Sequence, residues 1–218
     1  MSMAMILAAG RGERLRPVTD TVPKAMVEVN GEKLIDRHLR MLAAAGIETI
    51  VINLGWLGEQ IVEHVGSGEQ FGVQVVYSPE YDNVLETGGG IRRALPMLGS
   101  DPFWVVNADI HTEFEIEAGP LADELDAELI LVPTPPHKSN DDFALEHGKV
   151  RNTGGAGYTY AGIVRYRPAF FDGSEEGRFS VVPLMRAAAD AGKLGGRVYD
   201  GHWQDVGTPE RLADLNRR

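Results

Sequence analysis

The chain has 218 residues, of which 43% are hydrophobic and 24% charged, and its formal net charge is −11. Length and composition suffice for one hydrophobic core, so we expect a single domain over residues 1–218. The negative charge argues against general nucleic-acid binding, which needs a dominant basic face. With no membrane-length apolar run, signal peptide or cysteine in the sequence, we expect a cytoplasmic protein that does not bind membranes.

The first predicted element is a short buried strand that begins at Met5 and runs into a loop rich in glycine and cations, MILAAGRGERLRPVTDTVPK. Gly10 and Gly12 let the backbone approach a ligand, and such a loop suits phosphates because it carries four cations: Arg11, Arg14, Arg16 and Lys24. A dinucleotide fingerprint would need glycine in place of Leu15, and a P-loop would need Gly-Lys-Ser/Thr, so both are excluded. A solvated surface turn remains the alternative.

Helices and strands alternate through the next part of the chain. Apolar residues at helical spacing predict helices over residues 34–45 and 55–65, and Gly46 is a natural stop for the first. β-Branched and apolar runs predict strands over 49–53 and 72–78. This alternation favours an α/β fold, a Rossmann-like three-layer sandwich in which helices cover both faces of a mostly parallel central sheet.

Two further segments end or begin at positions suited to a ligand. The sequence LETGGGIRRALPML, residues 85–98, predicts a helix introduced by three glycines, whose bare N–H groups could hold an anion or a base edge; a flexible turn is the alternative. The apolar run FWVVNAD, residues 103–109, predicts a central strand with Asn107 and Asp109 at its carboxyl end, where open α/β sheets bind ligands. Capping or turn formation would explain a single aspartate there equally well.

The remainder of the chain is more irregular. We expect a short helix over residues 120–124, strands over 128–134, 159–166 and 197–199, a hairpin around 143–150, and helices over 181–191 and from Thr208. The polar stretch 135–158 is either a mobile segment that covers a ligand or a solvated loop. Asp205 lies in WQDVGTPERL before the final helix, where a cap or turn would account for it.

The pattern LAAGRGERLRP followed by Pro23-Lys24 resembles the signature of sugar-1-phosphate nucleotidyltransferases, which join a nucleoside triphosphate to a sugar 1-phosphate and release pyrophosphate. The WQDVGT motif near the end of the chain is similar to a second motif of that family. The stretches ETGGG, DF-x-L and T-x-AGI are most similar to its N-acetylmuramate-1-phosphate uridylyltransferases, which act in bacterial peptidoglycan recycling. The resemblance covers nearly the whole catalytic domain.

This resemblance implies a role for particular residues. Lys24 would be catalytic at the point where the two phosphates meet, and Arg14 would hold the β- and γ-phosphates. Asp109 and Asp205 would bind Mg²⁺, the implied cofactor. Nucleotide contacts would fall on Ala8, Ala9, Gly10, Gly12, Glu80 (or Glu86), Thr87 and Gly88, and sugar contacts on Asn107, Ala144, Asn152 and Thr159.

The sequence also departs from the family pattern on the sugar side. Many relatives carry Glu-Lys-Pro after the mid-chain hairpin, where this chain reads KVRNTGGAG, so Arg151 or Lys149 could substitute for the missing lysine. Ala144 stands where hexose-specific relatives often have glycine. An N-acetylmuramic acceptor adds a lactyl carboxylate, for which an arginine or lysine partner is expected.

We therefore predict an enzyme that transfers a nucleotidyl group to a sugar 1-phosphate, with UTP and N-acetylmuramic acid 1-phosphate as favoured substrates. The alternatives are mannose 1-phosphate with GTP, glucose 1-phosphate with dTTP or UTP, and cytidylyl transfer to a non-sugar phosphate. A non-catalytic nucleotide-sensing subunit would be expected to lose Lys24, Asp109 or Asp205, and all three are present. No hexapeptide repeat follows the final helix, so we expect no C-terminal β-helix domain.

Overall fold

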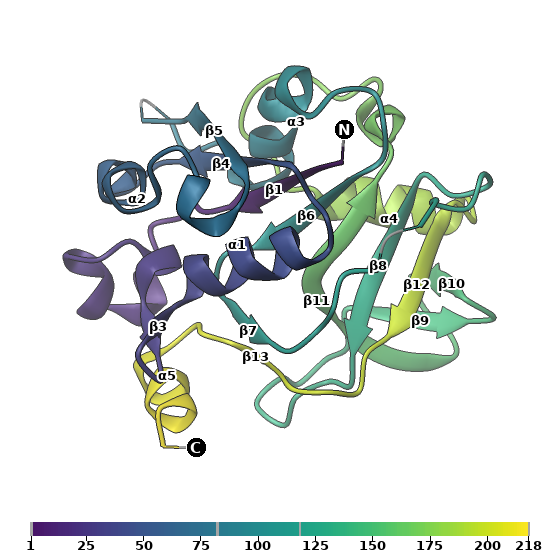
Figure 1. Cartoon of the computed structure of the whole chain (residues 1–218). Coiled ribbons are helices and arrows are strands. Elements are labelled where there is room, and N and C mark those ends of the chain that lie inside the picture. The colour runs from purple at the N-terminus through teal and green to yellow at the C-terminus, as the bar shows by residue number, and fades with distance from the viewer. Residues whose placement is uncertain (1, 82, 118, 218) are drawn as a thin grey trace.

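The computed structural model describes residues 2–81, 83–117 and 119–217 and contains a nine-stranded sheet between two layers of helices (Figure 1). The strand order is β5-β4-β1-β6-β11-β8-β12-β10-β9. These strands are β1 (Met3–Leu7), β4 (Thr49–Leu54), β5 (Gln74–Pro79), β6 (Phe103–Asn107), β8 (Ala127–Val132), β9 (Phe143–Glu146), β10 (Lys149–Arg151), β11 (Ala156–Tyr166) and β12 (Leu194–Val198).

Five α-helices and two small sheets complete the described part of the chain. The helices are α1 (Leu34–Ala44), α2 (Gly58–Val65), α3 (Glu86–Leu98), α4 (Val182–Asp190) and α5 (Pro209–Leu215). The two-stranded sheets pair β2 (Glu28–Val29) with β3 (Glu32–Lys33), and β7 (Ile110–Thr112) with β13 (Trp203–Asp205). No helix in residues 2–81, 83–117 and 119–217 is both long and apolar enough to cross a membrane.

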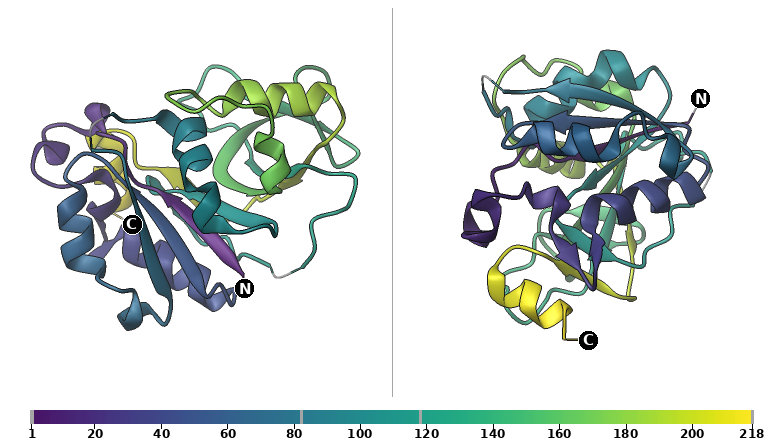
Figure 2. Two further views of the ribbon diagram at one scale, coloured as in Figure 1. Left: turned by 90° about the horizontal axis from the view of Figure 1, so that it is seen from above. Right: turned by 60° about the vertical axis from the view of Figure 1, so that its left-hand side comes forward.

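Strand β1 lies between two hydrophobic layers, one on each face of the sheet. Ala4 and Ile6 belong to the buried cluster that includes Ile35 of α1, whereas Met5 belongs to the cluster that includes Ile91 of α3 and Met185 of α4. Successive strand residues point to opposite faces, so a continuous apolar run is what a strand covered on both sides requires. The two views of Figure 2 show helices on both faces of the sheet.

The sheet is mixed, which corrects the prediction of a mostly parallel one. Strands β5, β4, β1 and β6 are parallel, but β11 is antiparallel to both β6 and β8. Strand β9 pairs with β10 and with β11, so the strands from β11 to β9 curve into a partly barrel-like unit. The regular alternation of strand and helix stops after β6; β9 and β10 are joined by a tight hairpin, in which His147 and Gly148 have positive φ.

Most predicted elements are present with ends shifted by one to a few residues, including the hairpin of β9 and β10. The short helix predicted over 120–124 is wrong. The carbonyl groups of Leu121 and Leu125 accept hydrogen bonds from the Arg167 side chain at 2.9 and 2.8 Å. Because these carbonyl groups bind the Arg167 guanidinium, the segment has a non-helical backbone and is held beside the end of β11.

Candidate active site

The glycine and arginine loop after β1 forms one wall of a cavity of about 210 Å³, which we call the nucleotide cavity. Gly12 has φ of 67°, and a Cβ on it would approach Thr19 at 3.0 Å and the Lys24 side chain at 3.2 Å. Glycine here therefore permits the left-handed turn and leaves space for Lys24. The loop residues that line the cavity are four of those for which the resemblance implies nucleotide contacts, Ala8, Ala9, Gly10 and Gly12, together with Lys24, for which it implies a catalytic role.

A buried polar network supports the opposite wall of this cavity. The Ala8 N–H donates to Asn53 Oδ1 at 2.6 Å, and Asn53 Nδ2 donates to Glu80 Oε1 at 2.9 Å. Glu80 Oε2 accepts from the Leu85 N–H at 2.9 Å. Glu80 is 1% exposed, so its carboxylate joins the phosphate loop to the start of α3. Asn53 was not singled out from the sequence; the available signal was a polar residue near the end of the apolar run TIVIN.

The start of α3 is clamped by residues 176–181, which we call the strap. The N–H groups of Gly88 and Gly89 both donate to the Phe179 carbonyl oxygen, at 2.9 and 3.1 Å. The Thr87 hydroxyl accepts from a strap N–H at 3.0 Å, and Figure 2 shows the strap, in green, passing beside α3. The prediction of bare N–H groups at these glycines is therefore wrong, because the strap carbonyl occupies them.

Close packing explains the three consecutive glycines, of which Gly90 lies against the buried polar network, where a Cβ would come within 2.7 Å of Glu80 Oε1. A Cβ on Gly88 would lie 2.3 Å from the Phe179 ring, and one on Gly89 would lie 2.0 Å from the Gly177 carbonyl oxygen. Contacts this short leave no room for a side chain. Gly88 is buried against the strap and is not among the lining residues of the nucleotide cavity, whereas Glu86 and Thr87 are.

Two aspartates far apart in the sequence meet beyond the end of β6. Asp109 follows this strand in the turn to β7, and β7 pairs with β13 so that Asp205 lies opposite Ile110 (Figure 1). The Val206 N–H donates to the Asp109 carbonyl oxygen at 2.7 Å. This pairing, which the sequence did not predict, brings together the two residues expected to bind metal.

Each aspartate contacts a cation. Lys24 Nζ donates to Asp109 Oδ2, and Arg211 of α5 donates to Asp205 Oδ2. The other oxygen of Asp205 is buried without a hydrogen-bond partner among the described residues, and His137 Nε2 lies 3.5 Å from it. A cationic side chain therefore lies beside each of the two carboxylates, which are near the carboxyl end of β6.

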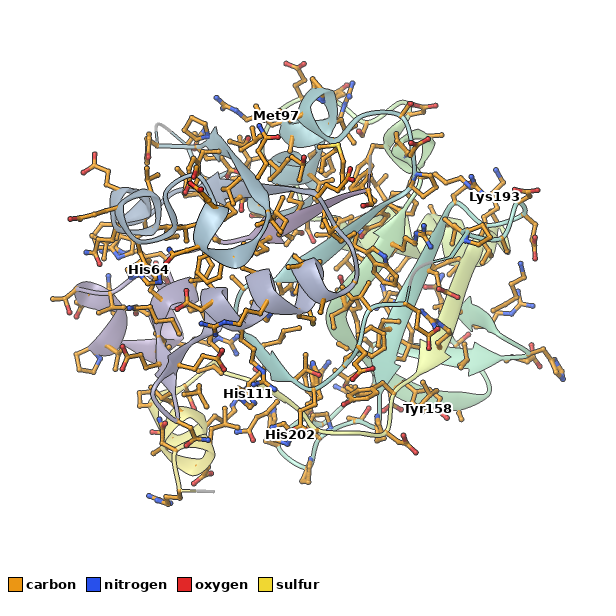
Figure 3. All side chains as sticks on the ribbon, viewed as in Figure 1. His64, Met97, His111, Tyr158, Lys193 and His202 are labelled. Atoms are coloured by element: carbon orange, nitrogen blue, oxygen red, sulfur yellow. The ribbon has the colours of Figure 1, made fainter. Side chains whose placement is uncertain are left out.

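Two buried histidine environments lie behind the aspartates. His38 of α1 is fully buried, and this burial lowers its pKa to about 4 against the opposing effect of the Asp109 charge. His111 Nδ1 lies 3.0 Å from His202 Nε2, with the rings edge to face (Figure 3). Burial, reinforced by the charge of Arg37, lowers the pKa of His111 to about 4. His111 lies on β7 and His202 directly precedes β13, so this ring contact links β7 to the start of β13, the two strands that bring Asp205 beside Asp109.

A second cavity of about 380 Å³, which we call the acceptor cleft, meets the first at Asn107 and Asp109. Lys138 reaches it from the loop between β8 and β9, and its Nζ donates to Thr159 Oγ1 at 3.3 Å. Arg14 also lines the cleft and has no carboxylate within ion-pair distance among the described residues. The cleft is thus rich in donors for anions, among them Arg14, His137, Lys138, Thr159 and Arg211.

Two residues predicted to bind the sugar lie away from this cleft. Ala144 is buried in β9 opposite Gly157 of β11. Asn152 Nδ2 donates to the Arg186 carbonyl at 3.0 Å and to Asp190 Oδ1 at 2.7 Å, so it is held against α4. Neither lines the acceptor cleft, whereas the predicted residues Asn107 and Thr159 do.

The cations of the cleft also differ from those the sequence pointed to. Arg151 and Lys149 lie on β10 and pair with glutamates at 3.6 and 3.9 Å, so neither replaces the missing family lysine in the cleft. Lys138 and Arg211 line the cleft instead. Neither was singled out, because each lies in a polar segment whose fold is set by distant contacts.

The sequence model of the nucleotidyl transferase family matches residues 3–141. The chain belongs to this family. It is 46% identical to an N-acetylmuramate alpha-1-phosphate uridylyltransferase of Neisseria meningitidis, over 97% of this chain and 95% of that one. A protein of the same name from Caulobacter vibrioides is 36% identical over 95% of this chain and 93% of the other. The enzyme class predicted from the opening motif is thereby confirmed.

Solved structures show the same fold for this nucleotidyl transferase. A Bacillus anthracis structure assigned as a glucose-1-phosphate thymidylyltransferase superposes with a TM-score of 0.85, covering 99% of this chain and 94% of that one at 22% identity. HddC from Yersinia pseudotuberculosis, complexed with GMP-PN, superposes with a TM-score of 0.79, covering 100% and 99% at 22% identity. The mixed α/β architecture is therefore that of sugar nucleotidyltransferases.

Proposed function

We propose that this nucleotidyl transferase couples UTP to N-acetylmuramate α-1-phosphate, giving the UDP-sugar and pyrophosphate. The observation that carries the proposal is the 46% identity to the Neisseria meningitidis uridylyltransferase, which extends over 97% of the chain and so includes both cavities. The reaction is an in-line attack by an acceptor phosphate oxygen on the α-phosphorus of the nucleotide. Both reactants are polyanions, so the protein has chiefly to offset charge repulsion.

The nucleotide cavity suits a nucleoside triphosphate. Small side chains at Ala8 and Ala9 leave the backbone open to a flat base, and Thr87 and Glu80 lie on the far wall. Lys24 would place a compact positive charge between the two reacting phosphates, for which it would leave its contact with Asp109. Arg14, which lacks a carboxylate partner among the described residues, is free to hold the β- and γ-phosphates and the departing pyrophosphate.

Asp109 and Asp205 have the chemistry that a magnesium ion requires. Both offer carboxylate oxygens, and one oxygen of Asp205 is buried without a hydrogen-bond partner in the described chain. The described residues include no group of three or more His, Cys, Asp and Glu able to hold a metal, which fits an ion that takes its other ligands from phosphates and water. When bound there, Mg²⁺ would neutralise charge on the reacting phosphates.

The acceptor cleft fits an anion with two charged groups. N-acetylmuramate 1-phosphate carries a phosphate and a lactyl carboxylate, and the cleft has cations in three places: Arg14, Lys138 and Arg211. Arg211 is engaged by Asp205, and Arg14 is needed for the nucleotide phosphates. Lys138 is paired with the half-buried Asp142 at 2.5 Å, but Asp142, unlike Asp205, does not line the cleft, so Lys138 is our assignment for the lactyl carboxylate.

A pyrophosphate-release assay with magnesium tests the function, with UTP, dTTP, GTP, CTP and ATP crossed against sugar 1-phosphates and products identified by mass. UDP-N-acetylmuramic acid as dominant product is the expected result, and another dominant pair would overturn the substrate assignment. Lys138→Ala should raise KM for N-acetylmuramate 1-phosphate roughly tenfold, because one charge-assisted hydrogen bond is lost. N-acetylglucosamine 1-phosphate is the matched control, and an equal loss with both acceptors would refute the role of Lys138.

A further inference from the structure

A third cavity, of about 310 Å³, lies between α3 and the strap. Arg92 and Arg93 of α3 line it on one side, and Glu176 and Gly177 of the strap line it on the other. We propose that this cavity binds a small phosphate-bearing anion and that binding there changes the affinity of the nucleotide cavity. This site is separate from the two cavities that the proposed reaction uses.

The charges of the cavity favour an anion. Neither Arg92 nor Arg93 makes an ion pair or side-chain hydrogen bond within residues 2–81, 83–117 and 119–217, and the Arg92 Nε is buried without an acceptor. The neighbouring strap arginine, Arg178, is by contrast paired with Glu86 at 2.9 Å. Glu176 is the single carboxylate of the cavity and lies beyond ion-pair distance of both guanidinium groups. Two unpaired arginines against one carboxylate leave a net positive site in an otherwise acidic protein.

Phosphate is the anion that these donors recognise best. A guanidinium presents a planar fork of N–H groups that matches two phosphate oxygens, so Arg92 and Arg93 would bind phosphate through their terminal nitrogens. Neighbouring residues on a helix point in different directions, but Arg92 and Arg93 both line this cavity and can approach a single phosphate from two sides. The cavity also has the volume for pyrophosphate or for the phosphate end of a sugar phosphate.

The strap connects this cavity to the nucleotide site. Gly177, which lines the anion cavity, packs its carbonyl against Gly89 of α3, and Phe179 exchanges backbone hydrogen bonds with Leu85, Gly88 and Gly89. Thr87 lies in the same helical turn and lines the nucleotide cavity. An anion held by Arg92 and Arg93 of α3 would lie against Glu176 and Gly177 of the strap, so its charge would alter the contact between α3 and the strap. It would therefore act on KM for the nucleotide rather than on the chemical step.

The test is an amide chemical-shift titration of the full-length protein with inorganic phosphate in the absence of substrates. We expect saturable shifts at Gly89, Arg93 and Gly177 in the parent and in Arg14→Gln, which removes an active-site phosphate ligand. In the double variant Arg92→Gln/Arg93→Gln these shifts should weaken about tenfold or more in apparent affinity. Persistence of the same shifts in the double variant, or shifts confined to residues 10–24, would overturn the site.

Glu176→Ala should change phosphate affinity in the opposite direction to the double variant. It removes the carboxylate that competes with the anion, so phosphate should bind severalfold more tightly. Unchanged or weaker binding in Glu176→Ala would refute the electrostatic argument. Parallel titrations with pyrophosphate and with N-acetylglucosamine 1-phosphate identify which source of phosphate binds most tightly. The readout is binding without turnover, so it is independent of whether the proposed reaction holds. A phosphate-dependent change in KM for UTP that is equally large in the parent and in the double variant would refute the coupling.

Discussion

Replacing Gly89 with alanine tests the contact between α3 and the strap. In an ordinary helix interior this change stabilises by about 1 kcal/mol, because alanine has the higher helix propensity. Here the new Cβ would lie 2.0 Å from the Gly177 carbonyl oxygen, a backbone atom that cannot rotate away. Moving the strap would cost about 1–3 kcal/mol for overpacking and about 1 kcal/mol for a weakened hydrogen bond to Phe179. The net expectation is a loss of about 1–3 kcal/mol in the free energy of unfolding.

Urea unfolding measures this loss, and steady-state kinetics measure its effect on the nucleotide cavity. KM for UTP should rise more than kcat falls, because Thr87 in the same turn lines that cavity and is tied to the strap. Gly10→Ala is the stability control, since a Cβ there meets nothing within 4 Å. If Gly89→Ala were as stable as the parent, with unchanged KM, the strap would not clamp α3 in solution.

Three further changes probe the aspartate pair and its surroundings. Lys24→Ala should lower kcat much more than it raises the Kd for UTP, because its strongest interaction is expected in the transition state. Asp205→Asn should raise the magnesium concentration needed for half-maximal turnover, whereas Asp214→Asn on the surface of α5 should not. Since burial lowers the pKa of His38 from 6.5 to about 4, the unfolded chain binds this proton first as pH falls. The parent should therefore lose up to about 3 kcal/mol of stability relative to His38→Leu between pH 7 and pH 4, as unfolding at both values would show.

A specific result would contradict each of these three predictions. Near-normal turnover in Lys24→Ala, or an unchanged magnesium dependence in Asp205→Asn, would remove that residue from the proposed chemistry. A stability difference between the parent and His38→Leu that stays constant from pH 7 to pH 4 would mean that His38 is not held neutral by burial.

The residues at the ends of β1 and β6 were predictable because their signals are local. Gly10, Gly12 and Lys24 lie within one short motif, and Asn107 and Asp109 follow directly from a strand that is apolar throughout. Parallel strands deliver their carboxyl ends to one edge of the sheet, so such residues meet once the strand assignment is right. The parallel part of the fold and the grouping of these residues around one cavity were therefore within reach of the sequence.

Other features depend on contacts between distant segments. The pairing of β7 with β13 joins Ile110 to Asp205 through two very short strands, which carry no periodic signal of their own. Gly88 and Gly89 of ETGGG are explained by the strap, about ninety residues further along the chain, and Gly90 is explained by Glu80 and Asn53. The antiparallel half of the sheet arises from hairpins and irregular loops, for which strand and helix alternation is no guide. The sequence shows glycine at such positions without showing what approaches it.

In the proposed reaction, the two halves of the sheet would bind different substrates. The nucleotide cavity is built from the ends of β1 and β4 and the start of α3, whereas the acceptor cleft is built from β11, the loop after β8, β13 and α5. Asn107 and Asp109 are the lining residues common to both. Because the walls are otherwise separate, changes at Lys138 or Thr159 can alter the choice of acceptor without moving the base-binding wall. On the same proposal, changes at Asp109 should affect both substrates together, since that carboxylate lines both cavities.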